Sequence, residues 1–306
     1  MQTLTEKRVF GTKFGTTELF VASETGLVGV TVSADQIGEF GLAHRGAVRS
    51  VDVDERGVLI GTDEDVLHSR YEADREDRTA QSRTFSPFGD DPFGGVVAVG
   101  WGSNRAIAAD ASGTVAASDP ADNWVTLGEV DGVRAVDGDL VAASDGVYRI
   151  TGDGLARVGL SDVRDVAGHG TPLAATADGL FALGNGWLDV REGAFDRVAS
   201  DGHGHAHAVG SAGLLRRTAG DGPVDEGWTT DELPVGSPVV DVAYGSGVVA
   251  AVAEDGTLAV DAGDGWRHQL LGVRGACGLA VGPGQSVGPE ESVGPEESTG
   301  PEESVE

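Results

Sequence analysis

The histidines His203, His205 and His207 have the spacing in this chain that most resembles a chemical site. In an extended strand, alternate side chains share one face, so all three imidazoles would point to the same side. Imidazole groups arranged in this way can bind zinc or copper. The alternative is a polar turn or strand edge, because the sequence fixes no cysteine or carboxylate as a further ligand. We therefore name these residues as candidate metal ligands and assign no metal or other cofactor.

A second candidate site consists of Phe85, Phe88 and Phe93, which lie close together in the segment FSPFGDDPFGG. This segment belongs to a longer interruption of the pattern, residues 70–95, whose first half is dense in charge. Aromatic clusters often dominate the affinity of protein interfaces, so these rings are candidate partner-binding residues. In the alternative interpretation they fold back and cap the structure beneath them.

Other motifs give no catalytic or cofactor-binding residue. The stretch Gly210-Ser211-Ala212-Gly213 lacks the earlier glycine of a nucleophile elbow. Residues Asp52-Val53-Asp54 begin like a calcium loop, but Arg56 occupies the fifth position, where an oxygen ligand belongs. Cys277 lies among small apolar residues, which indicates a buried structural thiol.

The elements that must position these residues are short strands in a repeating pattern. Residues Val163–Val190 contain four predicted strands, with a turn at Ala177-Asp178-Gly179 between the second and the third. Asp-Gly and similar pairs supply the positive φ angles of tight hairpins. Comparable turns recur at Glu24-Thr25-Gly26, Asp63-Glu64-Asp65, Ala111-Ser112-Gly113, Asp145-Gly146, Ser211-Ala212-Gly213 and Glu254-Asp255-Gly256.

Two further markers keep phase with these turns. Trp124, Trp187, Trp228 and Trp266 each fall where the fourth strand of a repeat would begin, and a large ring there can cover the seam between neighbouring sheets. Apolar first strands precede the turns, as in VRSVDV (48–53), VRAV (133–136), VRDV (163–166) and VVDV (239–242).

Four short antiparallel strands per repeat predict an all-β fold, a single β-propeller of seven blades, with six or eight as alternatives. The first repeat lacks a first strand, whereas Ala276–Val281 has the pattern of a first strand with no strand after it. We expect the two ends to form one blade, which removes open sheet edges. In the competing arrangement, Arg8–Phe14 supplies the missing strand.

The domain boundaries follow from a change in composition near the C-terminus. Residues 1–284 are predicted to form the propeller. Residues 285–306 repeat the unit SVGPEE with little variation, and proline and glutamate at this density leave too few apolar groups for a core. We therefore predict a disordered acidic tail.

The charge of the chain limits its partners and environment. The formal net charge is −29, and only two of the 21 basic residues are lysine. Molar salt shortens the Debye length to about 3 Å and screens repulsion between surface carboxylates, so the composition predicts a salt-adapted protein. Basic residues are scattered, which argues against nucleic acid as a partner. The single cysteine and the absence of a long apolar run predict a cytoplasmic protein without a membrane partner.

The turns and tryptophans resemble those of the WD40-like, YVTN-like and BNR (Asp-box) propeller superfamily. Segments such as Asp261–Trp266 and Gly184–Trp187 are similar to degraded Asp-boxes, although the tryptophans lack the aspartate that follows in WD40 repeats. The acidic composition also resembles that of propeller proteins of halophilic archaea. This resemblance implies the propeller fold and supplies no activity. Our leading hypothesis is a monomeric, non-catalytic interaction scaffold that binds a protein or a small ligand. The alternative is a hydrolase with a metal-assisted or acid/base site at the channel mouth.

Overall fold

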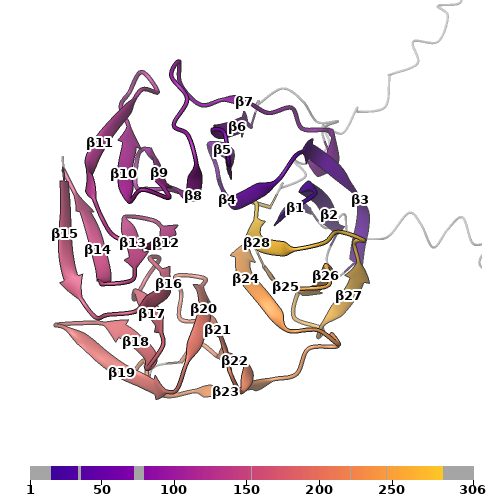
Figure 1. The fold of residues 1–306 in the computed structure, drawn as a ribbon. Coiled ribbons are helices and arrows are strands. Elements are labelled where there is room, and N and C mark those ends of the chain that lie inside the picture. The colour runs from indigo at the N-terminus through magenta and orange to yellow at the C-terminus, as the bar shows by residue number, and fades with distance from the viewer. Residues whose placement is uncertain are drawn as a thin grey trace, which may run out of the picture.

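The computed structural model describes residues 15–33, 36–71, 79–152, 154–220, 222–245 and 247–284. They form seven four-stranded antiparallel sheets arranged as blades around a central axis (Figure 1). The predicted seven-bladed propeller is confirmed. Within these residues the only helix is one 3-10 turn, η2 (Ala80–Ser82). No helix in this part of the chain is long and apolar enough to cross a membrane.

We number the blades along the chain and give the strands of each from the axis outward. Blade 1 is β28 (Ala276–Val281), β1 (Thr16–Ser23), β2 (Gly26–Ser33) and β3 (Gln36–Arg45); blade 2 is β4 (Val48–Asp54), β5 (Gly57–Thr62), β6 (Val66–Arg70) and β7 (Ser86–Pro87). Blade 3 is β8 (Val96–Trp101), β9 (Ala106–Asp110), β10 (Thr114–Ser118) and β11 (Trp124–Glu129); blade 4 is β12 (Val133–Asp137), β13 (Leu140–Ala143), β14 (Gly146–Thr151) and β15 (Gly154–Gly159).

The remaining blades follow the same order. Blade 5 is β16 (Val163–Ala167), β17 (Leu173–Thr176), β18 (Gly179–Leu183) and β19 (Trp187–Glu192); blade 6 is β20 (Phe195–Ser200), β21 (Ala206–Gly210), β22 (Gly213–Arg217) and β23 (Trp228–Asp231). Blade 7 is β24 (Val239–Gly245), β25 (Val248–Ala253), β26 (Thr257–Asp261) and β27 (Arg267–Leu270).

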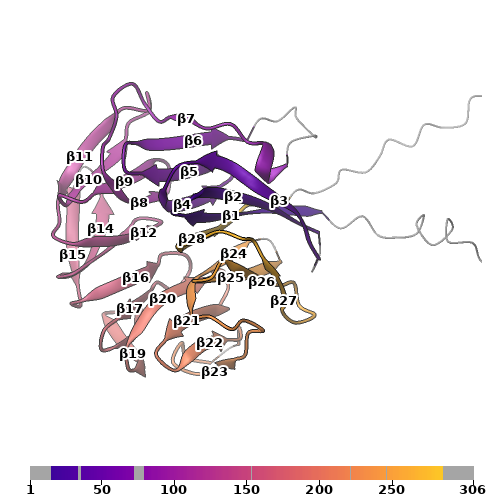
Figure 2. The ribbon, with the colours of Figure 1, turned by 45° about the vertical axis from the view of Figure 1, so that its right-hand side comes forward.

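Blade 1 is built from both ends of the chain, as the sequence predicted. The C-terminal strand β28 pairs antiparallel with β1, with Leu19 opposite Val281. The backbone N–H of Gly282 then donates to the carbonyl of Glu18 at 2.7 Å. Both views place the yellow β28 beside the indigo β1 (Figures 1 and 2). The competing strand, Arg8–Phe14, lies outside the described residues.

The turns and tryptophans occupy the positions that the repeat predicts. All seven predicted turns join the second and third strands of their blades. Trp124, Trp187 and Trp228 begin β11, β19 and β23, and Trp266 directly precedes β27. The indole N–H of Trp187 donates to the carbonyl of Val158 in blade 4 at 3.0 Å. Its ring therefore covers the seam between blades 4 and 5.

Every innermost strand carries a β-bulge at its second residue. In β16, for example, Val163 and Asp165 pair with consecutive residues of β17, and Arg164 is left without a partner opposite. The same register shift occurs in β4, β8, β12, β20, β24 and β28. A bulge redirects the side chains beyond it, so residues at matching positions of the seven strands face the axis in the same way.

The hydrophobic core lies between the blades. One cluster joins blades 7 and 1 through Val252, Val260, Val30 and Leu279, and similar clusters occupy other seams. Alanine and valine provide most of these contacts, for example Ala108, Ala142 and Ala174 in the middle strands. Small side chains permit the close approach of twisted sheets near the axis, where the blades converge.

Candidate functional site

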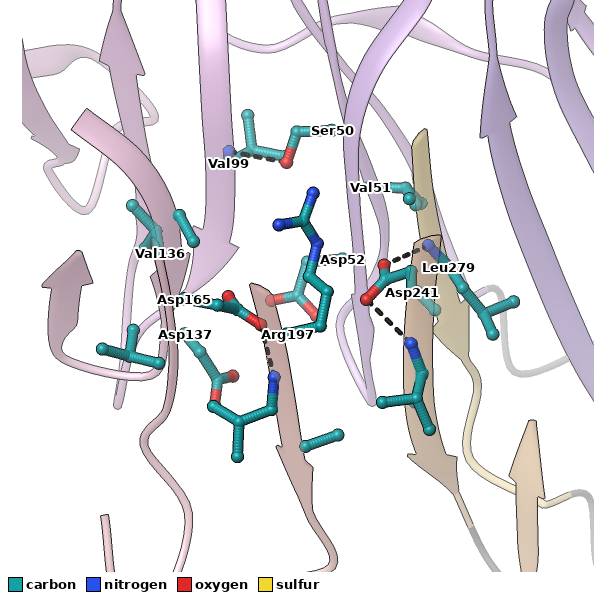
Figure 3. Close-up of a pocket in the computed structure, with 18 of the residues that line it drawn as sticks. Ser50, Val51, Asp52, Val99, Val136, Asp137, Asp165, Arg197, Asp241 and Leu279 are labelled. Atoms are coloured by element: carbon teal, nitrogen blue, oxygen red, sulfur yellow. Dashed lines mark hydrogen bonds between the residues drawn. The ribbon is translucent and has the colours of Figure 1, made fainter. Parts of the chain in front are cut away.

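The innermost strands enclose a polar cavity of about 280 Å³ on the propeller axis. Counted from the first residue of each strand, the third and fifth residues supply the ionisable side chains. Third residues include Asp165, Arg197 and Asp241, and Asp52 and Asp137 are fifth residues. Figure 3 shows these groups converging from separate blades, with the Arg197 side chain extending between the carboxylates.

Two of the side chains that join neighbouring blades belong to blade 2. The Trp101 N–H of blade 3 donates to Oδ2 of Asp52 at 2.6 Å, and the Val99 N–H donates to Oγ of Ser50 at 3.1 Å. Counted from the first residue of each innermost strand, the acceptor residue in both cases stands one position earlier than the donor residue. Blade 2 is therefore tied to blade 3 by two side-chain acceptors at the channel.

The same rule holds at three further seams. The N–H groups of Gly168, Val198 and Leu279 donate to Asp137, Asp165 and Asp241 of the preceding blades, at 2.5, 2.9 and 2.7 Å. These carboxylates satisfy backbone donors that the diverging innermost strands cannot satisfy by pairing with one another. The Asp241 bond also joins blade 7 to blade 1, where the propeller closes.

Burial raises the pKa of three of these carboxyl groups. It raises the pKa of Asp52 and of Asp165 to about 7 and that of Asp241 to about 6. By accessible area the three side chains are only half-buried, because they face the cavity, but they lie deep in the molecule. Removal from bulk water is costly for a negative charge, and neutral N–H donors offset only part of that cost.

Arg197 is a positive group that extends among the carboxylates of this cavity. In blade 6 this arginine stands where blades 5 and 7 place Asp165 and Asp241. Burial acts to lower the pKa of Arg197, but the charges of Asp165 and Asp241 outweigh it and raise that pKa. Arg197 thus balances part of the negative charge of the channel.

One mouth of the channel opens into a larger cavity of about 570 Å³ that is lined by residues of blades 2 to 5. His169 stands at this mouth, with Nδ1 3.5 Å from Oδ2 of Asp137, and that carboxylate raises the pKa of His169 to about 9. The Arg56 guanidinium stacks on the Trp101 ring at 4.4 Å and pairs with Asp54. In the segment that begins like a calcium loop, Asp54 is thus paired with Arg56.

The three predicted histidines do not converge. His203 and His205 are exposed and precede β21, whereas His207 is 2% exposed within that strand. The extended strand that would align them begins only at Ala206, because a turn organised by Asp201 precedes it. Among the described residues no group of three or more potential ligands has the geometry to hold a metal.

His207 instead joins blades 6 and 7. Its Nδ1 lies 2.6 Å from the hydroxyl of Tyr244 in β24, and its Nε2 lies 3.0 Å from Oδ2 of Asp231 in β23. The ring of Trp266 contacts it edge-on, with 6.0 Å between centroids. The hydrogen bond from His207 lowers the pKa of Asp231, whereas burial raises that of Tyr244.

The three phenylalanines pack onto the propeller. Phe88 is 2% exposed and contacts the rings of His68, Trp101 and Trp124. Phe93 is half-buried against Trp124, and Phe85 is half-buried against His44. Phe88 is therefore a core residue at the seam of blades 2 and 3, and its ring offers no surface to a partner. Phe85 and Phe93 keep part of their surface exposed.

A buried ion pair anchors the described part of the 70–95 segment. Arg83 pairs with Glu18 of β1, and both side chains are nearly inaccessible to solvent. The Arg83 guanidinium also stacks on the ring of Tyr71 at 4.1 Å. The segment continues into β7, which pairs with β6 and completes blade 2.

The channel residues carried a signal in the sequence that the apolar pattern concealed. The motifs VRSVDV, VRDV and VVDV contain Asp52, Asp165 and Asp241, and an aspartate repeated inside an apolar strand calls for a buried partner. That partner is a backbone N–H of the next blade, which sequence spacing does not reveal. Cys277 occupies the bulge of β28, where its thiol donates to the Val48 carbonyl at 3.3 Å and burial raises its pKa to about 11.

Comparison with known proteins agrees with this architecture. A family model described as "Beta-prop_HVO_0234:-like, beta propeller" matches residues 3–282. A search of curated proteins found no match.

Several solved propellers are similar to the chain in structure. The RRP9 WD40 repeats have a TM-score of 0.59 at 12% identity, covering 79% of this chain and 88% of that one. The Pan2 WD40 domain of Neurospora crassa has a TM-score of 0.56 at 12% identity, with coverage of 76% and 82%. YCF48 bound to D1 peptide has a TM-score of 0.55 at 13% identity, with coverage of 76% and 92%. At these identities the likeness shows the fold alone.

Proposed function

The chain belongs to the HVO_0234-like β-propeller family, and from this premise we propose that it is a non-catalytic binding module, an interaction scaffold for another protein. The observation that carries this proposal is the use of the channel carboxylates as joints between blades. Asp52, Asp137, Asp165 and Asp241 each accept a backbone N–H from the next blade. A rigid ring of this kind presents loops and strand edges to a partner. The WD40-type fold typically serves such a role.

The binding surface that we propose is the exposed tip of the 70–95 segment. This segment departs most from the plain repeat of blade 5, and Arg83 fixes its base against Glu18. At the tip, Asp90 and Asp91 are exposed beside the half-buried Phe93. An apolar ring flanked by carboxylates suits a partner with basic and apolar side chains.

Affinity purification from a molar-KCl lysate tests this surface. The tagged full-length chain is compared with Asp90→Lys/Asp91→Lys and with a control, Asp178→Lys, in the exposed turn of blade 5. We expect the double variant to lose a specific protein that the wild type and the control both retain. Equal retention by all three chains, or no specific protein, contradicts the proposal.

We also propose that the protein works as a monomer in a salt-rich cytoplasm. The support is the net charge of −29 together with the scarcity of lysine. Dialysis from molar KCl to dilute buffer should unfold the chain, because unscreened carboxylates repel one another. Circular dichroism at both salt levels measures this, and identical melting curves contradict it.

One observation favours the alternative, a hydrolase at the channel mouth. Asp52 and Asp165 have pKa values near 7, a range that suits general acid/base catalysis. A panel of ester, phosphoester and glycoside substrates tests this alternative on wild type, Asp52→Asn and Asp165→Asn. Turnover by the wild type that either variant abolishes would replace the scaffold by an enzyme.

A further inference from the structure

A cleft of about 380 Å³ lies between blades 6 and 7, away from the channel carboxylates. Its wall is largely apolar, formed by residues such as Val248, Val249 and Ala262. Polar groups also line it, among them the imidazole of His205, the guanidinium of Arg216 and the hydroxyl of Tyr244. An apolar concave wall with a few convergent polar groups is the usual composition of a small-molecule site.

Beneath this cleft lies a buried chain of hydrogen bonds. Asp231 holds Nε2 of His207 at 3.0 Å, and Nδ1 of His207 lies 2.6 Å from the Tyr244 hydroxyl. The side chain of His207 is only 2% exposed and that of Asp231 only 11%. Tyr244 is half-buried and stands between the cleft and the central channel, since it lines both. The chain thus presents one hydroxyl at the cleft.

Arg216 provides a free positive charge at the cleft. It is exposed, and the described part of the chain offers its guanidinium no hydrogen bond or ion pair, although its charge reaches both Asp231 and Tyr244. The two carboxylates that line the cleft are already engaged. Asp201 pairs with His205 at 2.7 Å, and Asp261 accepts backbone N–H groups of its own turn.

We propose that this cleft binds a carboxylate attached to an apolar group. The carboxylate lies on Arg216 and Tyr244, and the apolar part packs against Val248 and Ala262. A guanidinium and a hydroxyl are the donors that a carboxylate requires, and charge-assisted bonds of this kind are the stronger ones. This binding site goes beyond the protein-binding role proposed above and does not depend on it.

The state of His207 decides whether Tyr244 can donate to the ligand. When His207 is neutral and its Nε2–H donates to Asp231, its Nδ1 accepts the tyrosine O–H, and no proton remains for the carboxylate. When both ring nitrogens carry protons, Nδ1–H donates to the tyrosine oxygen, and the O–H is free to turn to the ligand. The hydrogen bonds of His207 therefore set whether the Tyr244 hydroxyl can serve as a donor at the cleft.

Calorimetric titration of the full-length chain in molar KCl tests the site with hexanoate, hexylamine and acetate. We expect hexanoate to bind, and hexylamine and acetate to bind at least about tenfold more weakly, which corresponds to 1.4 kcal/mol. Molar salt screens mere long-range attraction, so binding that survives there requires direct contact. Absence of hexanoate binding, or equal binding of hexylamine, overturns the proposal.

A second titration, with peptides, distinguishes the sources of such a carboxylate. A pentapeptide that ends in leucine is titrated with a free and with an amidated C-terminus. Tight binding of the free form alone identifies a protein C-terminus as the ligand, whereas binding of hexanoate but of neither peptide identifies a small molecule. Both results support a carboxylate site, and tighter binding of the amidated form contradicts it.

Three variants locate the binding. Arg216→Gln should weaken hexanoate binding by about tenfold or more, whereas Arg149→Gln, at an exposed arginine outside the cleft, should leave it unchanged. Tyr244→Phe should weaken hexanoate binding because it removes the hydroxyl donor. Urea unfolding curves confirm that the variants are folded. Unchanged affinity in folded Arg216→Gln or in folded Tyr244→Phe contradicts the assignment.

Discussion

The carboxylates of the channel and the carboxylate beneath the blade 6–7 cleft are both removed from water, yet their pKa values shift in opposite directions. Burial raises the pKa of Asp52, Asp165 and Asp241, whose hydrogen-bond donors are backbone N–H groups. The hydrogen bond from His207 lowers the pKa of Asp231. Neutral donors fix the position of a buried carboxylate without offsetting its lost hydration, whereas an imidazole that can carry charge does offset it.

This difference separates the structural role of the channel from the binding role that we propose for the cleft. In the channel, the acceptors are used by the next blade, and Arg197 balances part of the remaining charge. At the cleft, the hydrogen-bonded chain ends in a hydroxyl that faces an apolar wall, beside Arg216, which forms no ion pair with the described residues. The hydrogen-bond partner of a buried polar group therefore says more about the role of that group than its burial does.

Removal of a channel joint should have the largest effect. In Asp241→Ala, the N–H groups of Leu279 and Val242 lose their acceptor at the seam that closes the propeller. Each unsatisfied donor costs about 1–3 kcal/mol, so we expect a loss of about 2–4 kcal/mol in the free energy of unfolding. Urea unfolding in molar KCl measures it. Asp241→Asn retains one acceptor oxygen for the two donors and should lose less, and an equal loss in both variants would show that the charge rather than the acceptor matters.

A break in the His207 chain should rank second. His207→Leu leaves the Tyr244 hydroxyl and the Asp231 carboxylate without their shared partner, at a cost of about 1–3 kcal/mol. The control is His205→Leu, because His205 is exposed and should change the free energy of unfolding by less than about 0.5 kcal/mol. Equal effects of the two substitutions in urea unfolding would refute the contrast between them.

The pH dependence of stability should report the two carboxylate sets separately. The channel groups bind protons more tightly in the folded state than in the unfolded chain. Their contribution is therefore complete below about pH 4 and is lost as pH rises to about 7. Asp231 acts in the opposite way, because its contribution is present above about pH 4 and is lost below it.

Urea unfolding between about pH 4.5 and 7.5 checks this sign. Each channel group adds a slope of up to about 1.4 kcal/mol per pH unit within its window. Asp52→Asn and Asp165→Asn should each flatten the decline. A wild-type protein whose stability rises through this range would show that these carboxyls are not destabilised by burial.

The smallest of these effects should occur at the rim of the propeller. Trp187→Phe retains a ring at the seam of blades 4 and 5 but removes the N–H bond to Val158, at a cost of about 1 kcal/mol. The melting temperature of the full-length chain measures it. A loss as large as that of Asp241→Ala would mean that rim and channel joints are equivalent.

Sequence reasoning predicted the fold more fully than the candidate sites. The turns at Ala111-Ser112-Gly113 and Glu254-Asp255-Gly256 act locally, because Gly113 and Gly256 adopt the positive φ that the hairpin needs whatever surrounds it. The pairing of Ala276–Val281 with β1 was predictable because the first repeat lacked a first strand, and Ala276–Val281 had the pattern of a first strand with no strand after it. The prediction for His203, His205 and His207 assumed the alternation of an extended strand. His203 and His205 instead belong to a turn that Asp201 organises.

What the sequence determined by itself is the repeat. Strand length, hairpin turns and closure by both termini depend on contacts within a blade, and the tryptophans keep phase with them. What only the tertiary structure decided is the meaning of the polar residues. Asp165 accepts a hydrogen bond from the Val198 N–H, His207 is hydrogen-bonded to Tyr244, and Arg83 forms an ion pair with Glu18. In each pair the partners belong to different blades. Such partners are chosen by blade packing, and the electrostatics of a buried charge depends on everything packed around it.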